Sequence, residues 1–463
     1  MQNNSYHLIS LGCSKNTVDS ESMGQLLNKA GYIPEINPEN ASVLIVNTCG
    51  FIGPAKEESL QVLKELAAQK REEQYLIAAG CLTQRYGREI ARQVPGIDGI
   101  IGTRRWMDIL EVVKQMRPGK HPEPIYQIPE IEKTVMDKEG ILRVAVQGRS
   151  AYLKISDGCR RPCAFCAIPL IKGTAVSRPM NAILSETRLL DEMGMREIIL
   201  IAQDTTDYGH DQGMKDGLAE LLESMVVDLQ KHRQGINPDH QGVQWIRIMY
   251  AFPGYVTDRL IDVMATHSQI IPYLDIPLQH ADPGILRRMR RPANIDWVHK
   301  TIEKMRNKMQ DLALRTTFIV GYPGETEKEF QALLDFVEEI RFDKVGVFQF
   351  SFEPGTESEA LGDPVPAEEK QERWERIMAL QQSISLEKNQ AMVGKTIDVL
   401  IEGSGDGLSM GRTYRDAPEI DGLTLIDGEY PIGEMVPVFI TDALAYDLSG
   451  VVVNNSQKLF LAS

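Results

Sequence analysis

The stretch Gly158–Cys166, with the sequence GCRRPCAFC, holds three cysteines at the spacing C-x3-C-x2-C. It follows the strand-like run 152–156, so we expect the three thiols in one tight loop at the end of a strand. A tetrahedral zinc site or a complete cubane iron–sulfur cluster takes four protein ligands. Three thiolates leave one metal position open, which is the geometry needed when the metal also holds a reactant.

A zinc knuckle that lacks a ligand, or three unrelated core cysteines, would also give three thiols in this loop. Phe165, placed between the second and third cysteines, argues against both. The loop resembles the signature of the radical S-adenosylmethionine superfamily. The resemblance implies that Cys159, Cys163 and Cys166 hold a 4Fe–4S cluster, whose fourth iron binds the amine and carboxylate of S-adenosylmethionine.

Length and composition are those of an ordinary soluble globular protein. The 463 residues suffice for two or three domains, with 25% charged and 43% hydrophobic residues. We see no apolar run near the roughly 18 residues of a membrane span, and residues 1–7 do not resemble a secretory signal, so we expect a cytoplasmic protein. Six cysteines in such a chain indicate metal ligation or catalysis rather than disulfides. The net charge of −15 favours a basic protein partner over nucleic acid.

The other three cysteines share one local context, in which each follows a strand-like run and precedes a helical pattern. The runs are 6–11, 42–46 and 75–79, followed by Cys13, Cys49 and Cys81. This alternation predicts parallel βαβ units, whose post-strand loops all emerge at the carboxyl edge of the sheet. Three buried structural thiols are the alternative. The shared position favours a metal, and three thiolates again suggest a 4Fe–4S cluster with an open iron.

Changes in composition and in hydrophobic periodicity divide the chain into three parts. A fourth strand–helix unit covers 99–102 and 106–116, and the Pro/Gly-rich stretch 118–124 is the predicted boundary after it. Residues 125–143 show little periodicity and are expected to form a connector. The resulting domains are 5–118, 145–386 and 390–463.

The central part contains six strand-then-helix units, which predict a parallel sheet, open or curled into part of a barrel. The predicted strands are 152–156, 197–202, 244–249, 273–277, 315–320 and 344–350. The cysteine loop follows the first of them, at the carboxyl end where such sheets carry their chemistry. Six units match the partial (βα)6 barrel that the superfamily resemblance implies.

The same resemblance implies further cofactor contacts. Gln203 and Asp204 end the second strand, where the family places groups that hold the amino group of S-adenosylmethionine. Gly321 and Gly324 lie in the turn after the fifth strand, where backbone approaches the adenosine, although ordinary turn chemistry accounts for these glycines equally well. The backbone at Phe165 is expected to contact the adenine. We expect no side-chain general base, because the clusters carry the chemistry.

Two other patterns receive a weaker interpretation. The basic run Arg287–Arg291 is expected to be a solvated helix end rather than a contact with an acidic or RNA-rich surface. The eight histidines show no zinc-like pairing and are assigned no metal.

The C-terminal part changes character after an amphipathic pattern over 368–389, which predicts a connecting helix. Short β-like runs at 396–401, 436–440 and 450–453 predict a small antiparallel barrel, which resembles the TRAM module. From residue 397 onward it holds three basic and eleven acidic residues. Because RNA binding requires cations along the phosphates, this charge favours a basic protein such as a ribosomal protein.

The three parts in this order resemble the methylthiotransferase family over nearly the whole chain. One branch modifies an adenosine of tRNA, and the other the β-carbon of an aspartate in ribosomal protein S twelve. The stretches 277–281 and 411–422 and the acidic barrel resemble the second branch. The resemblance implies two 4Fe–4S clusters, S-adenosylmethionine, that ribosomal protein as substrate and an external electron donor, with no membrane and with RNA contact not favoured. The alternatives are the tRNA enzyme and a non-enzymatic iron–sulfur or zinc protein that acts as a sensor or scaffold.

Overall fold

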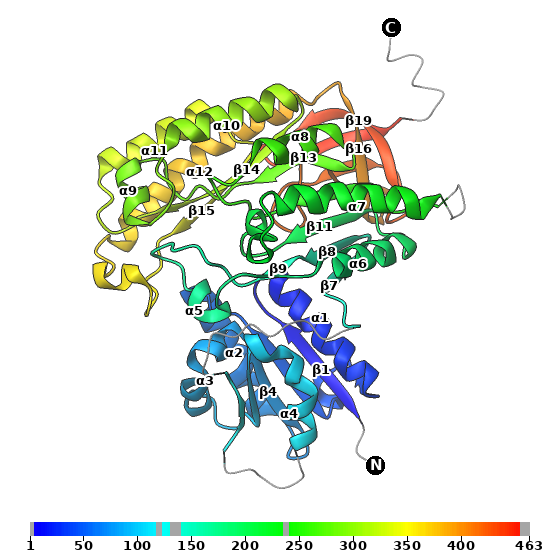
Figure 1. Ribbon diagram of the computed structural model, residues 1–463, viewed down its shortest axis with the longest axis vertical. Helices are drawn as coiled ribbons and strands as arrows, with labels where there is room; N and C mark the ends of the chain where they lie inside the picture. The colour runs from blue at the N-terminus through cyan, green and yellow to red at the C-terminus, as the bar shows by residue number, and fades with distance from the viewer. Residues whose placement is uncertain (1–3, 117–122, 130–139, 235–239, 454–463) are drawn as a thin grey trace.

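The computed structural model describes residues 4–116, 123–129, 140–234 and 240–453. Figure 1 shows three parts in chain order. The N-terminal α/β domain (blue to cyan) lies at one end, the central sheet and its helices (green to yellow) lie above it, and the small barrel (red) lies behind the central sheet. None of the described helices combines the length and apolar character that a bilayer crossing requires.

The N-terminal domain is built on a six-stranded parallel sheet with the order β2-β1-β3-β4-β5-β6. Its strands are β1 (Ser5–Ser10), β2 (Ile33–Pro34), β3 (Val43–Thr48), β4 (Tyr75–Gly80), β5 (Gly99–Gly102) and β6 (Ile125–Gln127). Its helices are α1 (Ser14–Lys29), α2 (Gly53–Gln69), α3 (Cys81–Gln93) and α4 (Ile109–Gln115), with 3-10 turns η1 (Pro38–Asn40) and η2 (Thr103–Asp108). The predicted parallel α/β domain is confirmed.

Helices cover both faces of this sheet, which explains its continuous apolar strands. Met23 and Leu27 of α1 pack with Val112 of α4 on one face. Leu63 of α2 and Ile90 of α3 pack on the other. Every residue of β3 is consequently buried, as expected for a central parallel strand.

The prediction of a connector over 125–143 is wrong at its start. Residues 125–127 form β6, which extends the sheet parallel to β5. Three residues are too few to show a period-2 pattern, so the sequence carries no signal for this edge strand. Residues 118–122 of the predicted boundary over 118–124, and residues 130–139 of the predicted connector, lie outside the described residues.

The central sheet has seven strands in the order β15-β14-β13-β12-β11-β8-β7. Its strands are β7 (Val144–Gln147), β8 (Ser150–Lys154), β11 (Glu197–Ile201), β12 (Trp245–Ile248), β13 (Ile270–Asp275), β14 (Ala313–Val320) and β15 (Lys344–Gln349). Six of them are parallel and follow the predicted positions, so the partial (βα)6 barrel is confirmed. β7 adds an antiparallel edge beside β8.

Helices cover the outer face of this sheet (Figure 1). They are α6 (Met180–Glu192), α7 (Gly217–Arg233), α8 (Asp258–Thr266), α9 (Pro283–Arg288), α10 (Ile295–Lys308), α11 (Glu327–Ile340) and α12 (Ala367–Gln390). The remaining short elements are β9 (Ser156–Asp157), α5 (Ile168–Lys172), β10 (Val176–Ser177), η3 (Thr205–Asp207), η4 (His210–Gln212) and η5 (Glu357–Leu361). The predicted connecting helix is α12. It is also the helix of the sixth strand–helix unit, because it packs on β15, where Trp374 Nε1 donates to the Val347 carbonyl at 3.0 Å.

The C-terminal strands close into a barrel with the order β16-β17-β18-β20-β19. They are β16 (Thr396–Gly405), β17 (Leu408–Thr413), β18 (Thr424–Asp427), β19 (Met435–Ala443) and β20 (Leu448–Val452). All pairs are antiparallel except β18 with β20, so the predicted antiparallel barrel is confirmed with one parallel pair.

This barrel packs on the amino ends of the central strands. Arg412 Nη2 lies 2.7 Å from Glu197 Oε2, and Arg247 Nε donates to Glu197 Oε1 at 2.6 Å. Lys344 Nζ lies 2.7 Å from Asp416 Oδ1. Since Glu197 and Lys344 are the first residues of β11 and β15, the barrel closes this end. The carboxyl ends of the central strands face the N-terminal domain instead.

Candidate metal and cofactor centre

A cavity of about 410 Å³ lies between the N-terminal domain and the carboxyl ends of the central strands. Its walls come from both domains, and α5 lies at the junction between them (Figure 1). All six cysteines of the chain line this one cavity: Cys13, Cys49, Cys81, Cys159, Cys163 and Cys166. Two sets of thiols that are far apart in sequence therefore face the same space.

The N-terminal thiols converge because their strands are neighbours in the parallel sheet. Cys13 precedes α1, Cys49 follows β3, and Cys81 is the first residue of α3 after β4. Two glycines let these loops approach closely. A Cβ on Gly12, which has φ +94°, would lie 2.8 Å from the Cβ of Cys49, and a Cβ on Gly50 would lie 2.9 Å from the carbonyl carbon of Cys81. The predicted convergence of the three loops is what the structure shows.

The charges around these thiols differ. Burial opposes ionisation of Cys13, but the Lys15 ammonium and the N–H groups of Asn16 and Lys15 outweigh it and lower the pKa of this thiol. Burial raises the pKa of Cys49, and it raises the pKa of Cys81 to about 12 with a contribution from the other two thiols. The mutual effect of the thiols indicates that they share one local field. A bound metal cation would let the three thiols ionise together.

The loop over 158–166 is fixed by its backbone. Gly158 has φ +81°, and a Cβ there would lie 2.1 Å from the Thr174 carbonyl oxygen, so only glycine fits. The Cys159 N–H donates to the Gly173 carbonyl at 3.0 Å, which ties the start of the loop to the end of α5. Burial raises the pKa of Cys159 to about 11 and raises that of Cys166 further.

Each sulfur of this loop accepts one N–H group. The Arg161 N–H lies 3.5 Å from Cys159 Sγ, and the Ile168 N–H lies 3.5 Å from Cys166 Sγ. Arg291 Nη1 lies 3.5 Å from Cys163 Sγ. Donors of this kind favour sulfur in its anionic form. The three sulfurs therefore have the surroundings of metal-bound thiolates.

Arg291 is a site residue that sequence reasoning missed. The expected solvated helix end is correct for Arg290, which is exposed and pairs with Glu357 at 2.5 Å. Arg291 instead is buried, lines the cavity and stacks on the Phe252 ring at 4.1 Å. Its direction follows from the left-handed backbone at Arg290, φ +51°, which turns the chain after α9. A run of arginines carries no sign of that turn.

Two of the five residues expected to contact S-adenosylmethionine line the cavity, Phe165 and Gln203. Gln203 Nε2 donates to Asp157 Oδ1 at 3.3 Å. Gln203 Oε1 is buried and has no hydrogen-bond partner within the described residues. Since buried acceptors are normally paired, this oxygen fits the amino group of S-adenosylmethionine, the contact that the family resemblance implies for it.

The other three expected contacts are not among the residues that line the cavity. Asp204 is buried behind Arg161, whose Nε donates to Asp204 Oδ2 at 2.6 Å. Gly321 packs against the Lys370 side chain, and the Gly324 carbonyl accepts from Arg288 Nη2 at 2.8 Å. Arg161, which Asp204 binds, does line the cavity. The roles of these three residues stay predictions.

The arrangement suits clusters better than single ions. In the described part of the chain, no three or more His, Cys, Asp or Glu side chains converge as the ligands of one metal ion would. In a cubane each cysteine binds a different iron, so its ligands stand apart around a common space. Two triads of thiols on one cavity therefore fit two clusters, each with an iron left open.

Four cations line the cavity, Lys15, Arg161, Lys172 and Arg291. Among the described residues, no aspartate or glutamate lines it. Clusters held by thiolates carry negative charge, so this cationic wall is complementary to them.

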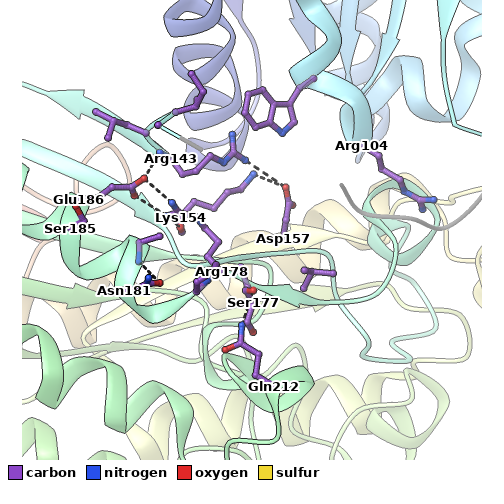
Figure 2. A pocket seen from close by; sticks show the side chains of 18 of the residues that line it. Arg104, Arg143, Lys154, Asp157, Ser177, Arg178, Asn181, Ser185, Glu186 and Gln212 are labelled. Carbon is purple, nitrogen blue, oxygen red and sulfur yellow. Dashed lines mark hydrogen bonds and ion pairs between the residues drawn. The ribbon is translucent and has the colours of Figure 1, made fainter. Parts of the chain in front are cut away.

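A second cavity, of about 560 Å³, lies beside β8 and the start of α6 (Figure 2). Four of its charged side chains form two pairs. Lys154 Nζ lies 3.0 Å from Asp157 Oδ2, and Arg178 Nη2 lies 2.7 Å from Glu186 Oε1, as Figure 2 shows. No cysteine is among the described residues that line it. We assign it no cofactor.

Models of known families match three segments of the chain. Residues 5–102 match the uncharacterized protein family UPF0004, residues 153–337 match the radical SAM superfamily, and residues 393–453 match the TRAM domain. The three matches follow the three parts of the fold.

Curated relatives match nearly the whole chain. The ribosomal protein uS12 methylthiotransferase RimO of Chloroflexus aurantiacus is 48% identical over 461 residues, which cover 96% of this chain and 99% of the relative. The RimO of Bdellovibrio bacteriovorus is 40% identical and covers 98% of each chain.

Solved structures are similar in fold at low identity. The radical S-adenosylmethionine methyltransferase TsrM of Kitasatospora setae matches with a TM-score of 0.56 at 12% identity, covering 90% of this chain and 80% of TsrM. The cobalamin-dependent enzyme OxsB matches with a TM-score of 0.50, covering 81% of this chain and 56% of OxsB.

Proposed function

The chain belongs to the RimO family of ribosomal protein uS12 methylthiotransferases, and on this premise we propose that it inserts a methylthio group at the β-carbon of an aspartate in uS12. It is a radical S-adenosylmethionine enzyme that transfers a sulfur-containing group. The family implies S-adenosylmethionine and a 4Fe–4S cluster. The observation that carries the proposal is the single cavity lined by both triads of thiols.

The cavity wall supports an assignment of residues to the cofactors. Cys159, Cys163 and Cys166 would hold the cluster that binds S-adenosylmethionine, and Cys13, Cys49 and Cys81 would hold a second cluster. When bound, the reduced first cluster and S-adenosylmethionine would supply hydrogen-atom abstraction, the second cluster would supply the sulfur, and a second S-adenosylmethionine would supply the methyl group. The one-electron reduction requires an external donor.

The side chains of the chain bind, orient and shield these groups. Gln203 Oε1 accepts a hydrogen bond from an N–H of the cofactor's ammonium group, which its unpaired and buried position supports. Arg161 is held by Asp204 at 2.6 Å and stacks on the Tyr255 ring at 3.6 Å, which keeps its guanidinium at the cavity wall. Phe165 and Phe252 give the wall apolar surface that excludes water from the reacting atoms. No side-chain general base is needed.

The surface charge of the C-terminal barrel supports a basic protein as partner. Both arginines of its described residues, Arg412 and Arg415, are buried against the central domain. Asp398, Asp427 and Glu434 are exposed. The exposed face is therefore acidic, which repels RNA and attracts a basic ribosomal protein.

The test is mass spectrometry of uS12 after reaction with the anaerobically reconstituted enzyme, S-adenosylmethionine and a one-electron reductant. We expect the mass increase of one methylthio group on one aspartate. A parallel reaction on tRNA is expected to give no product. Modified tRNA with unmodified uS12 would assign the chain to the other branch, and a colourless protein containing zinc but no iron would make it a sensor or scaffold.

A further inference from the structure

Three of the four cations that line the cluster cavity are already held by protein groups. Arg161 is paired with Asp204 at 2.6 Å. Lys172 Nζ lies 2.7 Å from Asp19 Oδ2. Arg291 donates to the Pro277 carbonyl oxygen and to the nearby cysteine sulfur. These three side chains stabilise the cavity wall, and their N–H groups already have partners within the protein.

Lys15 is the exception. Its Nζ lies 3.1 Å from the centroid of the Tyr250 ring. Within the described residues it makes neither a hydrogen bond nor an ion pair, although an ammonium has three N–H donors. An aromatic face stabilises such a cation by a modest amount and leaves donors available to a ligand. Lys15 is half-buried, and no aspartate or glutamate is among the described residues that line its cavity. Its ammonium can therefore bind an anion that enters the cavity.

The surroundings of Lys15 hold its ammonium in place. Lys15 lies in the first turn of α1, where the helix dipole also favours an anion. Tyr250 has a left-handed backbone with φ +61°, which is strained for a residue with a side chain. Its N–H donates to Asp275 Oδ2 at 3.1 Å, and its carbonyl accepts from the Thr205 N–H at 3.1 Å. These bonds keep the ring in position beneath the ammonium.

The ammonium also lies where the substrate must react. Lys15 is two residues from Cys13 of the N-terminal triad, whereas Tyr250 follows β12 of the central domain. The contact between them spans the two domains beside both sets of thiols. In an aspartate, the β-carbon is bonded directly to the carboxylate carbon. A group that binds the carboxylate at this point therefore also positions the β-carbon.

We propose that Lys15 binds the carboxylate of the target aspartate and selects it against uncharged substrates. The inference rests on the proposed function and deepens it, because it names the group that recognises the substrate. An adenine offers no negative charge at this place, so the same lysine disfavours the tRNA reaction. A lysine that only balanced the charge of the adjacent cluster would not distinguish aspartate from asparagine.

The experiment measures the dissociation constant of uS12 and of uS12 with the target aspartate changed to asparagine. Both are titrated against the reconstituted holoenzyme with S-adenosylmethionine and without reductant, so that binding is read without turnover. For the unmodified enzyme we expect aspartate to bind about 10- to 100-fold more tightly than asparagine, as for a hydrogen bond to a charged group. Lys15→Met is expected to bring this ratio close to one, because it weakens the binding of the aspartate form only. Lys15→Arg keeps the positive charge and is expected to keep the ratio.

The controls separate the possible failures. Lys64→Met, an exposed lysine of α2 in the same domain, is expected to leave the ratio unchanged. Iron content is measured on every variant. If Lys15→Met loses iron, Tyr250→Leu is used instead and is expected to reduce the ratio at least about threefold. The inference is overturned if the ratio of the two dissociation constants is unchanged in Lys15→Met, or in Tyr250→Leu when that variant is used instead. It is also overturned if the variant loses affinity equally for the aspartate and asparagine forms of uS12. An unmodified enzyme that does not methylthiolate uS12 refutes the proposed function itself.

Discussion

At the scale of single residues, Cys163 tests the central triad. Its sulfur accepts from Arg291 Nη1 at 3.5 Å and lies in the cavity wall. We predict that Cys163→Ala loses one cluster, about half of the bound iron, and all reductive cleavage of S-adenosylmethionine, because three ligands are the minimum that holds the cluster with one iron open. The measurements are iron content and the yield of 5′-deoxyadenosine. Cleavage at the full rate would contradict this assignment.

Cys49 tests the other triad by its separate effect. We predict that Cys49→Ala also loses about half of the iron but still cleaves S-adenosylmethionine, since the central loop is unchanged. No methylthio product should form, because the sulfur donor is missing. Cys49 lies next to Gly12, so the smaller alanine is accommodated without a clash. Normal product yield in this variant, or only about four irons in the unmodified enzyme, would argue against a second cluster.

The cysteines were predictable because each one follows a strand, and parallel strands bring such positions to one edge whatever their separation in sequence. Lys15 and Arg291 were not predictable. Lys15 contacts the ring of Tyr250, and Arg291 follows Arg290 in the chain. Both Tyr250 and Arg290 have a left-handed backbone. A non-glycine residue with positive φ is held there by its tertiary contacts, and these leave no pattern in the local sequence.

At the scale of elements, one buried carboxylate joins the two halves of the site. Asp19 of α1 lies 2.6 Å from Arg143 Nη2, 2.6 Å from Lys154 Nζ of β8 and 2.7 Å from Lys172 Nζ of α5. Because α1 begins after Cys13 and the central cysteine loop lies between β8 and α5, this cluster of charges sets how the two triads face each other. It is an ionic cluster between elements of different domains.

We predict that Asp19→Asn lowers the free energy of unfolding by about 3–5 kcal/mol, since three buried cations lose the nearer of the two carboxylates that they share and keep the farther one, Asp157. Urea unfolding of the apoprotein measures it. Asp228→Asn, which breaks a partly exposed pair with Arg188 at 2.7 Å, should cost about 1 kcal/mol or less. Equal effects of the two variants would refute the role of Asp19.

The same carboxylate makes stability depend on pH in a defined direction. Burial disfavours its charge, but Lys154, Lys172 and Arg143 outweigh burial and hold the pKa of Asp19 below its ordinary value. The stabilisation is complete above about pH 4, the ordinary pKa of an aspartate, and is lost as the pH falls below it. Asp19→Asn should therefore flatten the acid limb of the stability profile.

At the scale of the whole molecule, the central sheet is covered at both ends of its strands. The C-terminal barrel closes the amino ends through Glu197 and Lys344. The N-terminal domain covers the carboxyl ends and is held on a second side by Glu353, which lies 2.5 Å from Lys56 Nζ and 2.8 Å from Arg85 Nη1. The positions of four strands of the N-terminal sheet and of the six parallel strands of the central sheet could be predicted from hydrophobic runs, whereas the edge strands β2, β6 and β7 could not. The packing of the three parts could not, because it depends on buried ion pairs between residues that lie far apart in the sequence.

The acidic face of the C-terminal barrel lies at the end of the central domain opposite the cluster cavity, so it acts on the approach of uS12 rather than on its chemistry. We predict that Asp427→Lys combined with Glu434→Lys, both exposed, slows association with uS12 about tenfold at low salt and leaves the dissociation rate unchanged. Stopped-flow binding measures both rates. Reversing Glu72 and Glu111, exposed residues of the N-terminal domain, changes the net charge equally and is expected to have a smaller effect. The difference should vanish as salt shortens the range of the field. An association rate that ignores both salt and these substitutions would show that the barrel does not guide the substrate.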